Sequence, residues 1–242
     1  MNATYFAFEI KRIVRNPRFT SFAIAMPVAM YLLFAGIYGA EEVAPGVTSG
    51  ELTMVNMAAY GAMSASLFAG TRIAAERDAG WQRQLRLTPL SGSGYLAVKA
   101  VSSVLVGLPV ILLICGIAAA QGTTLSALQW THIVLGLWLA CLPFAALGIL
   151  LGLFTTGSSV QAITGGIMMP LGMLGGLWVP LRILPHWMVY VAKAMPTYWM
   201  GEVGRSAVMK SSGTGIAAFV LVAWLLVVSF AAVRRFQAGT AR

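Results

Sequence analysis

The stretch THIVLGLWLACLPFAALGILLGLF, Thr131–Phe154, holds 24 consecutive residues without one Asp, Glu, Lys or Arg. A helix needs about 20 apolar residues to cross the hydrocarbon core of a bilayer, so this stretch predicts a transmembrane helix. Five further apolar runs have a similar length: Phe19–Ala40, Leu52–Ile73, Ala97–Ala120, Ser159–Val179 and Gly215–Val233. Together they predict an all-α integral membrane protein with six transmembrane helices.

The composition indicates that lipid surrounds most of this surface. Hydrophobic residues make up 59% of the 242 residues and charged residues only 10%, whereas soluble domains contain about 25% charged residues. The residues between the runs are too few for a soluble domain, so residues 1–242 are predicted to form a single transmembrane domain. Cys115 and Cys141 lie inside apolar runs and are expected to be core residues.

The basic residues predict the orientation of the chain. They cluster before the first run, after the second run and after the last run: Lys11, Arg12, Arg15, Arg18; Arg72, Arg77, Arg83, Arg86; Arg234, Arg235, Arg242. Residues 41–51 hold three acids and no base, and residues 121–130 hold no charge. Because loops that face the cytoplasm are enriched in Lys and Arg, both termini are predicted to lie in the cytoplasm. The protein itself is predicted to be a multi-pass protein of the cell (inner) membrane. The net charge of +9 is assigned to topology and lipid headgroups, with no nucleic-acid partner.

Two segments outside the runs are predicted to lie at the membrane surface. Residues 1–18 place Phe6, Ile10 and Val14 on one helical face and bases largely opposite, which predicts an interfacial amphipathic helix. Residues 180–212 are basic and aromatic, and Pro185 and Pro196 each stand where a short helix can begin. We expect two short re-entrant or interfacial outer helices there, with a disordered outer loop as the alternative.

The second run carries polar residues at helical spacing, Thr53, Asn56, Tyr60, Ser64 and Thr71. They either line a path for an amphipathic substrate or bond to neighbouring helices, at about 0.6–2 kcal/mol per contact. The sequence leaves both readings open. The candidate path also includes three residues of the fifth run, Gln161, Thr164 and Met168. In the fourth run, Gly148-x-x-x-Gly152 predicts a close approach between helices.

The sequence lacks the motifs that would indicate ATP hydrolysis or zinc-dependent catalysis. Of the lysines, only Lys210 precedes a Ser or Thr, and Met209 stands where a phosphate-binding loop requires Gly. There is no His-Glu-x-x-His motif for zinc. All seven acids lie outside the runs or at their ends, which argues against coupling through charged relays. We therefore expect no catalytic residue, metal ligand or cofactor site, and an energy source on another subunit.

The loop at residues 74–96 is the most distinctive segment. It reads Glu76-Arg77-x-x-Gly80-Trp81-x-Arg83-x-Leu85-Arg86-x-Thr88-Pro89-Leu90, and Tyr95 and Lys99 follow it. Trp81 and Leu85 lie one turn apart with Arg83 beside them, which predicts a short amphipathic helix that docks a soluble partner. A plain charged topology loop is the alternative.

This pattern resembles the loop signature of permeases of type-2 ATP-binding-cassette (ABC) exporters, which move drugs, polyketides, polysaccharides and lipids. The likeness extends over the chain and includes Leu184-Pro185 and Pro196-Thr197-Tyr198 before the last run. Trp81 departs from it, since many relatives carry Thr there. The resemblance implies an ABC ATPase subunit in two copies, which binds ATP and Mg²⁺ itself and docks on the loop. It also implies a second permease copy or related permease, a path lined by spans two and five, and an outer gate at Leu184, Pro185, Pro196 and Tyr198.

Two classes of function follow from these observations. The first is a permease subunit of an ATP-driven exporter, of the multidrug-efflux kind, for an amphipathic or hydrophobic substrate. The alternative is the substrate-binding membrane subunit of a vitamin-type (energy-coupling-factor) importer. A third class, an intramembrane enzyme, is not supported, because the sequence shows no set of residues that could form its catalytic site.

Overall fold

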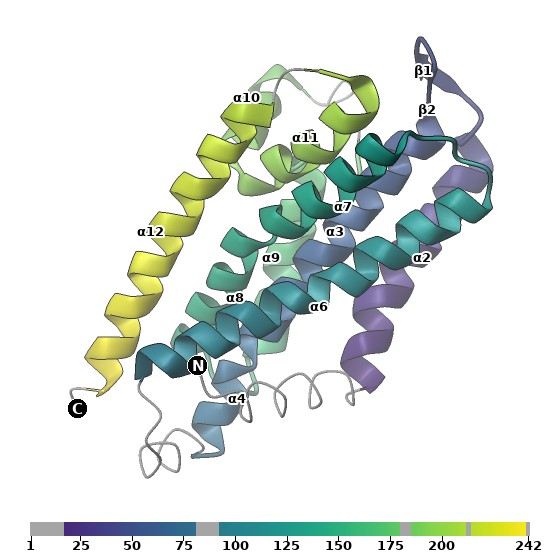
Figure 1. Ribbon diagram of the computed structural model, residues 1–242. Helices are drawn as coiled ribbons and strands as arrows, with labels where there is room; N and C mark the ends of the chain where they lie inside the picture. The colour runs from purple at the N-terminus through teal and green to yellow at the C-terminus, as the bar shows by residue number, and fades with distance from the viewer. Residues whose placement is uncertain (1–16, 81–91, 180–184, 212–213, 241–242) are drawn as a thin grey trace.

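The computed structural model describes residues 17–80, 92–179, 185–211 and 214–240. The described elements are α2 (Pro17–Tyr38), β1 (Glu42–Ala44), β2 (Val47–Thr48), α3 (Ser49–Thr71), α4 (Ile73–Asp78), α6 (Gly92–Ala120), α7 (Ala127–Ala140), α8 (Leu142–Phe154), α9 (Val160–Leu174), α10 (His186–Ala194), α11 (Pro196–Met209) and α12 (Thr214–Thr240). The long helices form a tilted bundle (Figure 1). At one end lie α10, α11 and the hairpin, and at the other lie α4, the start of α2 and the end of α12.

Among the described residues, four helical stretches are long and apolar enough to cross a membrane: Ser49–Asp78, Gly94–Ala120, Ala127–Phe154 and Thr214–Ala238. Two shorter apolar helices, Ile24–Tyr38 and Val160–Leu174, occupy the positions of the first and fifth expected spans. The fifth was predicted to continue to Val179. Instead α9 ends at Leu174, because the chain turns at Gly176 (φ +73°) and the Leu177 N–H bonds back to the Gly172 carbonyl.

Helix α3 occupies the centre of the bundle, where it packs against α2, α6, α8 and α11. Small side chains permit this burial. A Cβ on Gly148 of α8 would collide with the Leu67 carbonyl oxygen of α3, and one on Gly152 would lie 3.0 Å from the Thr71 carbonyl oxygen. The close approach predicted from the Gly148-x-x-x-Gly152 spacing is therefore confirmed, and it joins α8 to α3.

The fourth predicted span is a pair of helices with a break between them. Helix α7 begins earlier than predicted, at Ala127, where Ser126 and Gln129 form a capping box. It ends at Ala140, and α8 starts with Pro143 at its second position. Proline has no N–H to donate, so the ladder of backbone hydrogen bonds is interrupted there.

A short antiparallel hairpin, β1–β2, precedes α3 and was not predicted from the sequence. Its turn contains Pro45 and Gly46, which has φ +70° and donates its N–H to the Glu42 carboxylate at 2.7 Å. Thr48 then caps α3, because its side chain accepts the Glu51 N–H and Glu51 accepts the Thr48 N–H. The turn signal was present in the sequence, but the strands around it are only two or three residues long.

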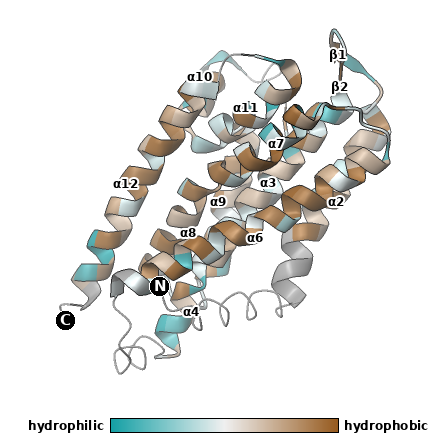
Figure 2. Ribbon diagram, in the orientation of Figure 1, coloured by the Kyte–Doolittle hydropathy of each residue, from teal (hydrophilic) through white to brown (hydrophobic). Residues whose placement is uncertain are grey.

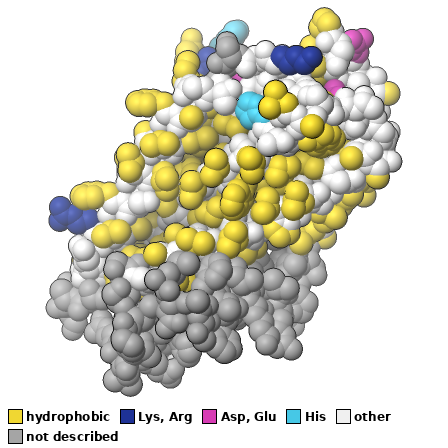
Figure 3. Space-filling view, viewed as in Figure 1, with side chains coloured by type: hydrophobic (Ala, Val, Ile, Leu, Met, Phe, Trp, Pro, Cys, Tyr) yellow, Lys and Arg dark blue, Asp and Glu magenta, His cyan; other side chains and the backbone are white. Residues whose placement is uncertain are grey.

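The outer surface of the bundle is apolar where a soluble protein would be polar. On α12, Phe219 is 75% exposed, Leu226 65% and Phe230 63%. Figure 2 shows α12 hydrophobic along most of its length and hydrophilic near its end. In Figure 3, hydrophobic side chains cover the middle of one face, with Lys, Arg, Asp, Glu and His at its edges. This is the surface of an all-α membrane protein.

Candidate functional site

A buried polar cluster lies at the base of the loop that the sequence singled out. Glu76 of α4 is 1% exposed, and its carboxylate accepts hydrogen bonds from Tyr95 Oη at 2.7 Å and from Lys99 Nζ at 2.5 Å. Lys99 is fully buried and Tyr95 is 3% exposed, and both belong to α6. The ring of Phe236 of α12 stacks on Tyr95 with centroids 6.1 Å apart. The two helices that flank the loop, α4 and α6, therefore meet at one carboxylate, and α12 packs on its Tyr95 partner.

The burial of this cluster makes its pairing energetically important. Removing one partner of a buried ion pair leaves an uncompensated charge and costs about 3–5 kcal/mol. Glu76 was predicted to belong to the ATPase-coupling loop. Its side chain points into the protein, where it fastens α4 to α6.

Two further contacts fasten α4 to the end of α8 and to the turn that follows it. Arg77 Nη1 donates to the Leu153 carbonyl oxygen at 2.7 Å, and Asp78 accepts the Gly157 N–H at 2.6 Å. A cation at the last carbonyls of a helix is favoured both by hydrogen bonding and by the helix dipole. Gly80 ends the segment with φ +69°, a conformation that other residues rarely adopt. The remaining predicted loop residues lie outside the described residues: Trp81, Arg83, Leu85, Arg86, Thr88 and Pro89.

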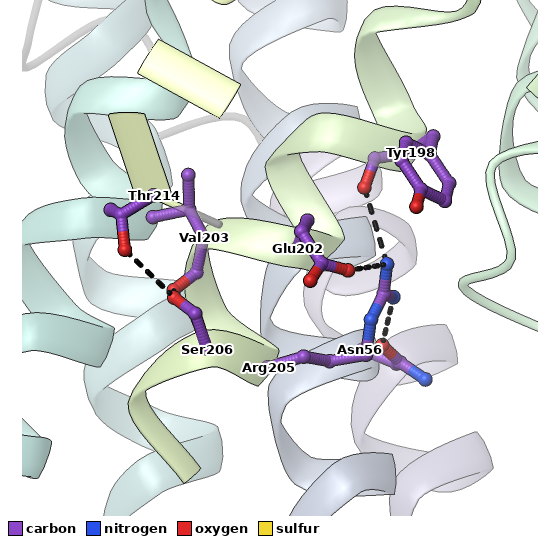
Figure 4. Close-up of polar contacts among 7 residues, drawn as sticks. All are labelled: Asn56, Tyr198, Glu202, Val203, Arg205, Ser206 and Thr214. Atoms are coloured by element: carbon purple, nitrogen blue, oxygen red, sulfur yellow. Dashed lines mark hydrogen bonds and ion pairs between the residues drawn. The ribbon is translucent and has the colours of Figure 1, made fainter. Parts of the chain in front are cut away.

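A second polar cluster lies near the opposite end of α3 (Figure 4). Arg205 of α11 donates from Nη1 to Asn56 Oδ1 at 3.1 Å. Its Nη2 donates to Glu202 at 3.3 Å and to the Tyr198 carbonyl oxygen at 3.2 Å. Arg205 and Glu202 are half-buried, with 14% and 26% of their side chains exposed. Desolvation raises the pKa of the Tyr198 phenol, and the Glu202 carboxylate raises it further.

The other polar residues of α3 make local contacts. Ser64 is buried and donates to the Gly61 carbonyl oxygen of its own helix, and Thr71 does the same with Phe68. The Tyr60 ring packs edge-on against Trp178 with centroids 4.9 Å apart, while Thr53 is half-buried. Asn56, by contrast, joins α3 to another helix through its hydrogen bond from Arg205 of α11.

The predicted path residues of α9 point in different directions. Thr164 is fully buried and donates to the Val160 carbonyl oxygen at 2.6 Å, and Met168 is 4% exposed. Gln161 is exposed. The structure therefore places Thr164 and Met168 against the bundle and Gln161 on its surface.

The outer segment contains the two short helices that its prolines predicted. Pro185 is the N-cap of α10, and Pro196 is the first residue of α11. Tyr198 is half-buried, and the Arg205 guanidinium lies 5.8 Å from its ring centroid. Leu184 lies outside the described residues.

Arg205 was missed as a site residue, although a signal for it exists in the sequence. Glu202 is the acid of the basic outer segment and precedes Arg205 by three residues, and this spacing places the two charges on one helical face. Its bond to Asn56 could not be inferred, since 149 residues separate the two.

Comparison with known proteins identifies the family to which this chain belongs. A family model described as "ABC-2 type transporter" matches residues 3–209. The chain belongs to the ABC-2 type transporter family. This ABC-2 transporter chain is also 29% identical over 223 residues to the "Putative transport permease YvfS" of Bacillus subtilis (strain 168), an alignment that covers 90% of this chain and 89% of the relative. The family expected from the pattern between Glu76 and Lys99 is confirmed.

In this ABC-2 transporter chain the two polar clusters lie near opposite ends of the largely buried stretch Ser49–Asp78, which α3 and α4 form together. Asn56 and Glu76 are 20 residues apart along α3 and α4, which corresponds to roughly 30 Å at 1.5 Å per helical residue. Within the described ranges, no three His, Cys, Asp or Glu side chains are placed to hold a metal ion.

Proposed function

We propose that this chain is the membrane-spanning permease subunit of an ATP-driven ABC exporter. The observation that carries the proposal is the fastening of α4. Glu76 binds Tyr95 and Lys99 of α6, and Arg77 binds the end of α8. A force applied next to α4 would reach α6 and α8 together, as a permease coupled to a separate ATPase requires.

In this proposal the ATPase subunits bind ATP and Mg²⁺ and dock beside α4, on the segment that contains Trp81 and Leu85. The chain crosses the membrane six times with both termini in the cytoplasm, and it pairs with a second permease. The start of α2 and the end of α12 lie at the α4 end of the bundle, which supports this orientation (Figure 1).

The outer cluster supplies a second mechanical connection. Helix α3 continues from the α4 end to Asn56, which accepts a hydrogen bond from Arg205 of α11. Movement of α3 along its axis would strain this contact and shift the outer helices α10 and α11. We assign Arg205 and Asn56 to the closed form of an outer gate, together with Pro196 and Tyr198.

The proposed substrate is amphipathic or hydrophobic. The described membrane helices carry exposed apolar side chains and neutral polar groups such as Gln161, and such surfaces suit a substrate that arrives from the lipid phase. The family match does not favour the vitamin-type importer, so we propose outward transport of the efflux type.

The test uses the full chain reconstituted in vesicles with its ATPase subunit and a fluorescent amphipathic dye. ATP-driven dye movement should require both proteins, and a Trp81→Ala, Leu85→Ala double variant should capture the ATPase roughly tenfold less well. An Arg83→Ala variant is the matched control, because an exposed ion pair contributes at most about 1 kcal/mol. Undiminished capture by the double variant would show that the ATPase does not dock on Trp81 and Leu85. Dye transport by the chain alone would refute ATP coupling.

A further inference from the structure

An apolar groove lies between α6, α8 and α12, with a volume of about 560 Å³. Both α6 and α12 pack against α8, which forms the floor of the groove. Of the described residues that line it, only Ser229 and Gln237 carry polar side chains. The groove is built from helices other than α3, α9 and α11, which hold the proposed path and gate.

The length of the groove matches one leaflet of a bilayer. Its lining extends from Gly92 to Val104 on α6 and from Leu225 to Gln237 on α12. Each of these twelve-residue steps corresponds to about 18 Å, and half of a hydrocarbon core is about 15 Å. A groove of this length that starts at the α4 end of the bundle would span about one leaflet.

The groove opens toward the lipid phase. Its α12 wall continues directly into the exposed apolar surface at Leu226, which is 65% exposed, and Val233, which is 43% exposed. On α6, Val101 is 41% exposed and groove-lining Ala97 is also exposed. Among the described residues, the opening is thus bordered by apolar side chains suited to contact with lipid hydrocarbon.

Basic side chains lie at the α4 end of the groove. Arg234 and Arg235 directly follow the lining residue Val233; the Arg234 guanidinium lies 5.1 Å from the Phe230 ring centroid, on the lipid-facing side. The two acids of α4 are already engaged, Glu76 with Lys99 and Asp78 with the Gly157 N–H. The cations at this level complement an anionic headgroup, because basic side chains at a membrane surface attract anionic lipids.

We propose that this groove binds one anionic phospholipid from the leaflet at the α4 end. One acyl chain lies between α6 and α12 over Ala100 and Ala146, and the phosphate lies at the level of Arg234. The inference goes beyond the proposed transport function, since it concerns a resident lipid on helices outside the path. It holds whatever substrate or ATPase the chain serves.

The experiment measures binding of 1-palmitoyl-2-oleoyl-phosphatidylglycerol to the purified full chain by native mass spectrometry in detergent. Two variants each place a large side chain in the groove: Ala97→Trp at its mouth and Ala100→Trp in its wall. Loss of about two buried methylene groups from the acyl chain should weaken binding roughly tenfold. Ala223→Trp is the matched control, because Ala223 is exposed on α12 and does not line the groove; its binding should be unchanged.

The headgroup is tested separately with Arg234→Gln, which should weaken phosphatidylglycerol binding about threefold and leave phosphatidylcholine binding unchanged. Circular dichroism and gel filtration of each variant establish that it is folded. The fold should tolerate Ala97→Trp, because Ala97 is exposed at the mouth of the groove. Unchanged binding in both groove variants would overturn the proposal. Equal weakening by Ala223→Trp would do so too, since the lipid would then be part of a general shell.

Discussion

Glu76→Gln tests whether the cluster at the base of the loop holds α4 in place. The amide keeps the shape of the carboxylate but removes its charge, which leaves the ammonium of Lys99 in a fully buried position. Breaking such a pair costs about 3–5 kcal/mol. At about 2–4 °C per kcal/mol for a chain of this size, the unfolding midpoint should fall by roughly 6–20 °C. The double variant Glu76→Gln, Lys99→Met removes both charges and should recover most of this loss.

The midpoint is measured by thermal unfolding of the purified chain in one detergent, with Glu41→Gln as the control for a lost acid. Glu41 is exposed, so its change should shift the midpoint by less than about 2 °C. In the complex with the ATPase, the single variant should capture the partner normally yet transport less dye per ATP hydrolysed. A Glu76→Gln variant as stable as the control, or a double variant less stable than Glu76→Gln alone, would refute the role given to this ion pair.

Three further predictions concern packing, the gate and topology. Gly148→Ala should destabilise the chain by about 1–3 kcal/mol in thermal unfolding, because its Cβ meets Leu67, whereas Gly165→Ala, which meets nothing within 4 Å, should not destabilise it. Asn56→Leu leaves Arg205 without its amide partner and should loosen the outer helices, seen as faster proteolysis of the segment around α11; an unchanged rate would show that the contact is dispensable. A cysteine at Thr124 should react with an impermeant thiol reagent from outside intact cells, and labelling only after lysis would reverse the proposed orientation.

The sequence predicted the elements of this fold well because hydropathy and proline act locally. The apolar runs correspond to described helices, and Pro185 and Pro196 each begin a short outer helix. The end of α9 at Leu174 was missed because it depends on the turn at Gly176, inside an apolar run. The hairpin at Pro45 and Gly46 was missed because its strands are too short to show an alternating pattern.

The candidate site was less accessible to sequence reasoning. The pattern with Glu76, Tyr95 and Lys99 was recognised, but whether its acid faces a partner or the protein interior depends on the packing of α4 against α6. The polar residues of α3 illustrate the same limit. Helical spacing places Asn56 and Ser64 on one face, yet Ser64 bonds to its own helix and Asn56 bonds to α11.

The central position of α3 has a consequence for how the protein is made. Among the four candidate spans, Ser49–Asp78 is the least hydrophobic and the most deeply buried, while Thr214–Ala238 is the most hydrophobic and the least buried. A nascent helix enters the bilayer according to its own hydrophobicity, but α3 leaves the ribosome before the α6 and α8 surfaces that later enclose it. Its stable insertion should therefore wait for α6, and a chain that stops after residue 80 should be retained in the membrane less efficiently than one that stops after residue 120.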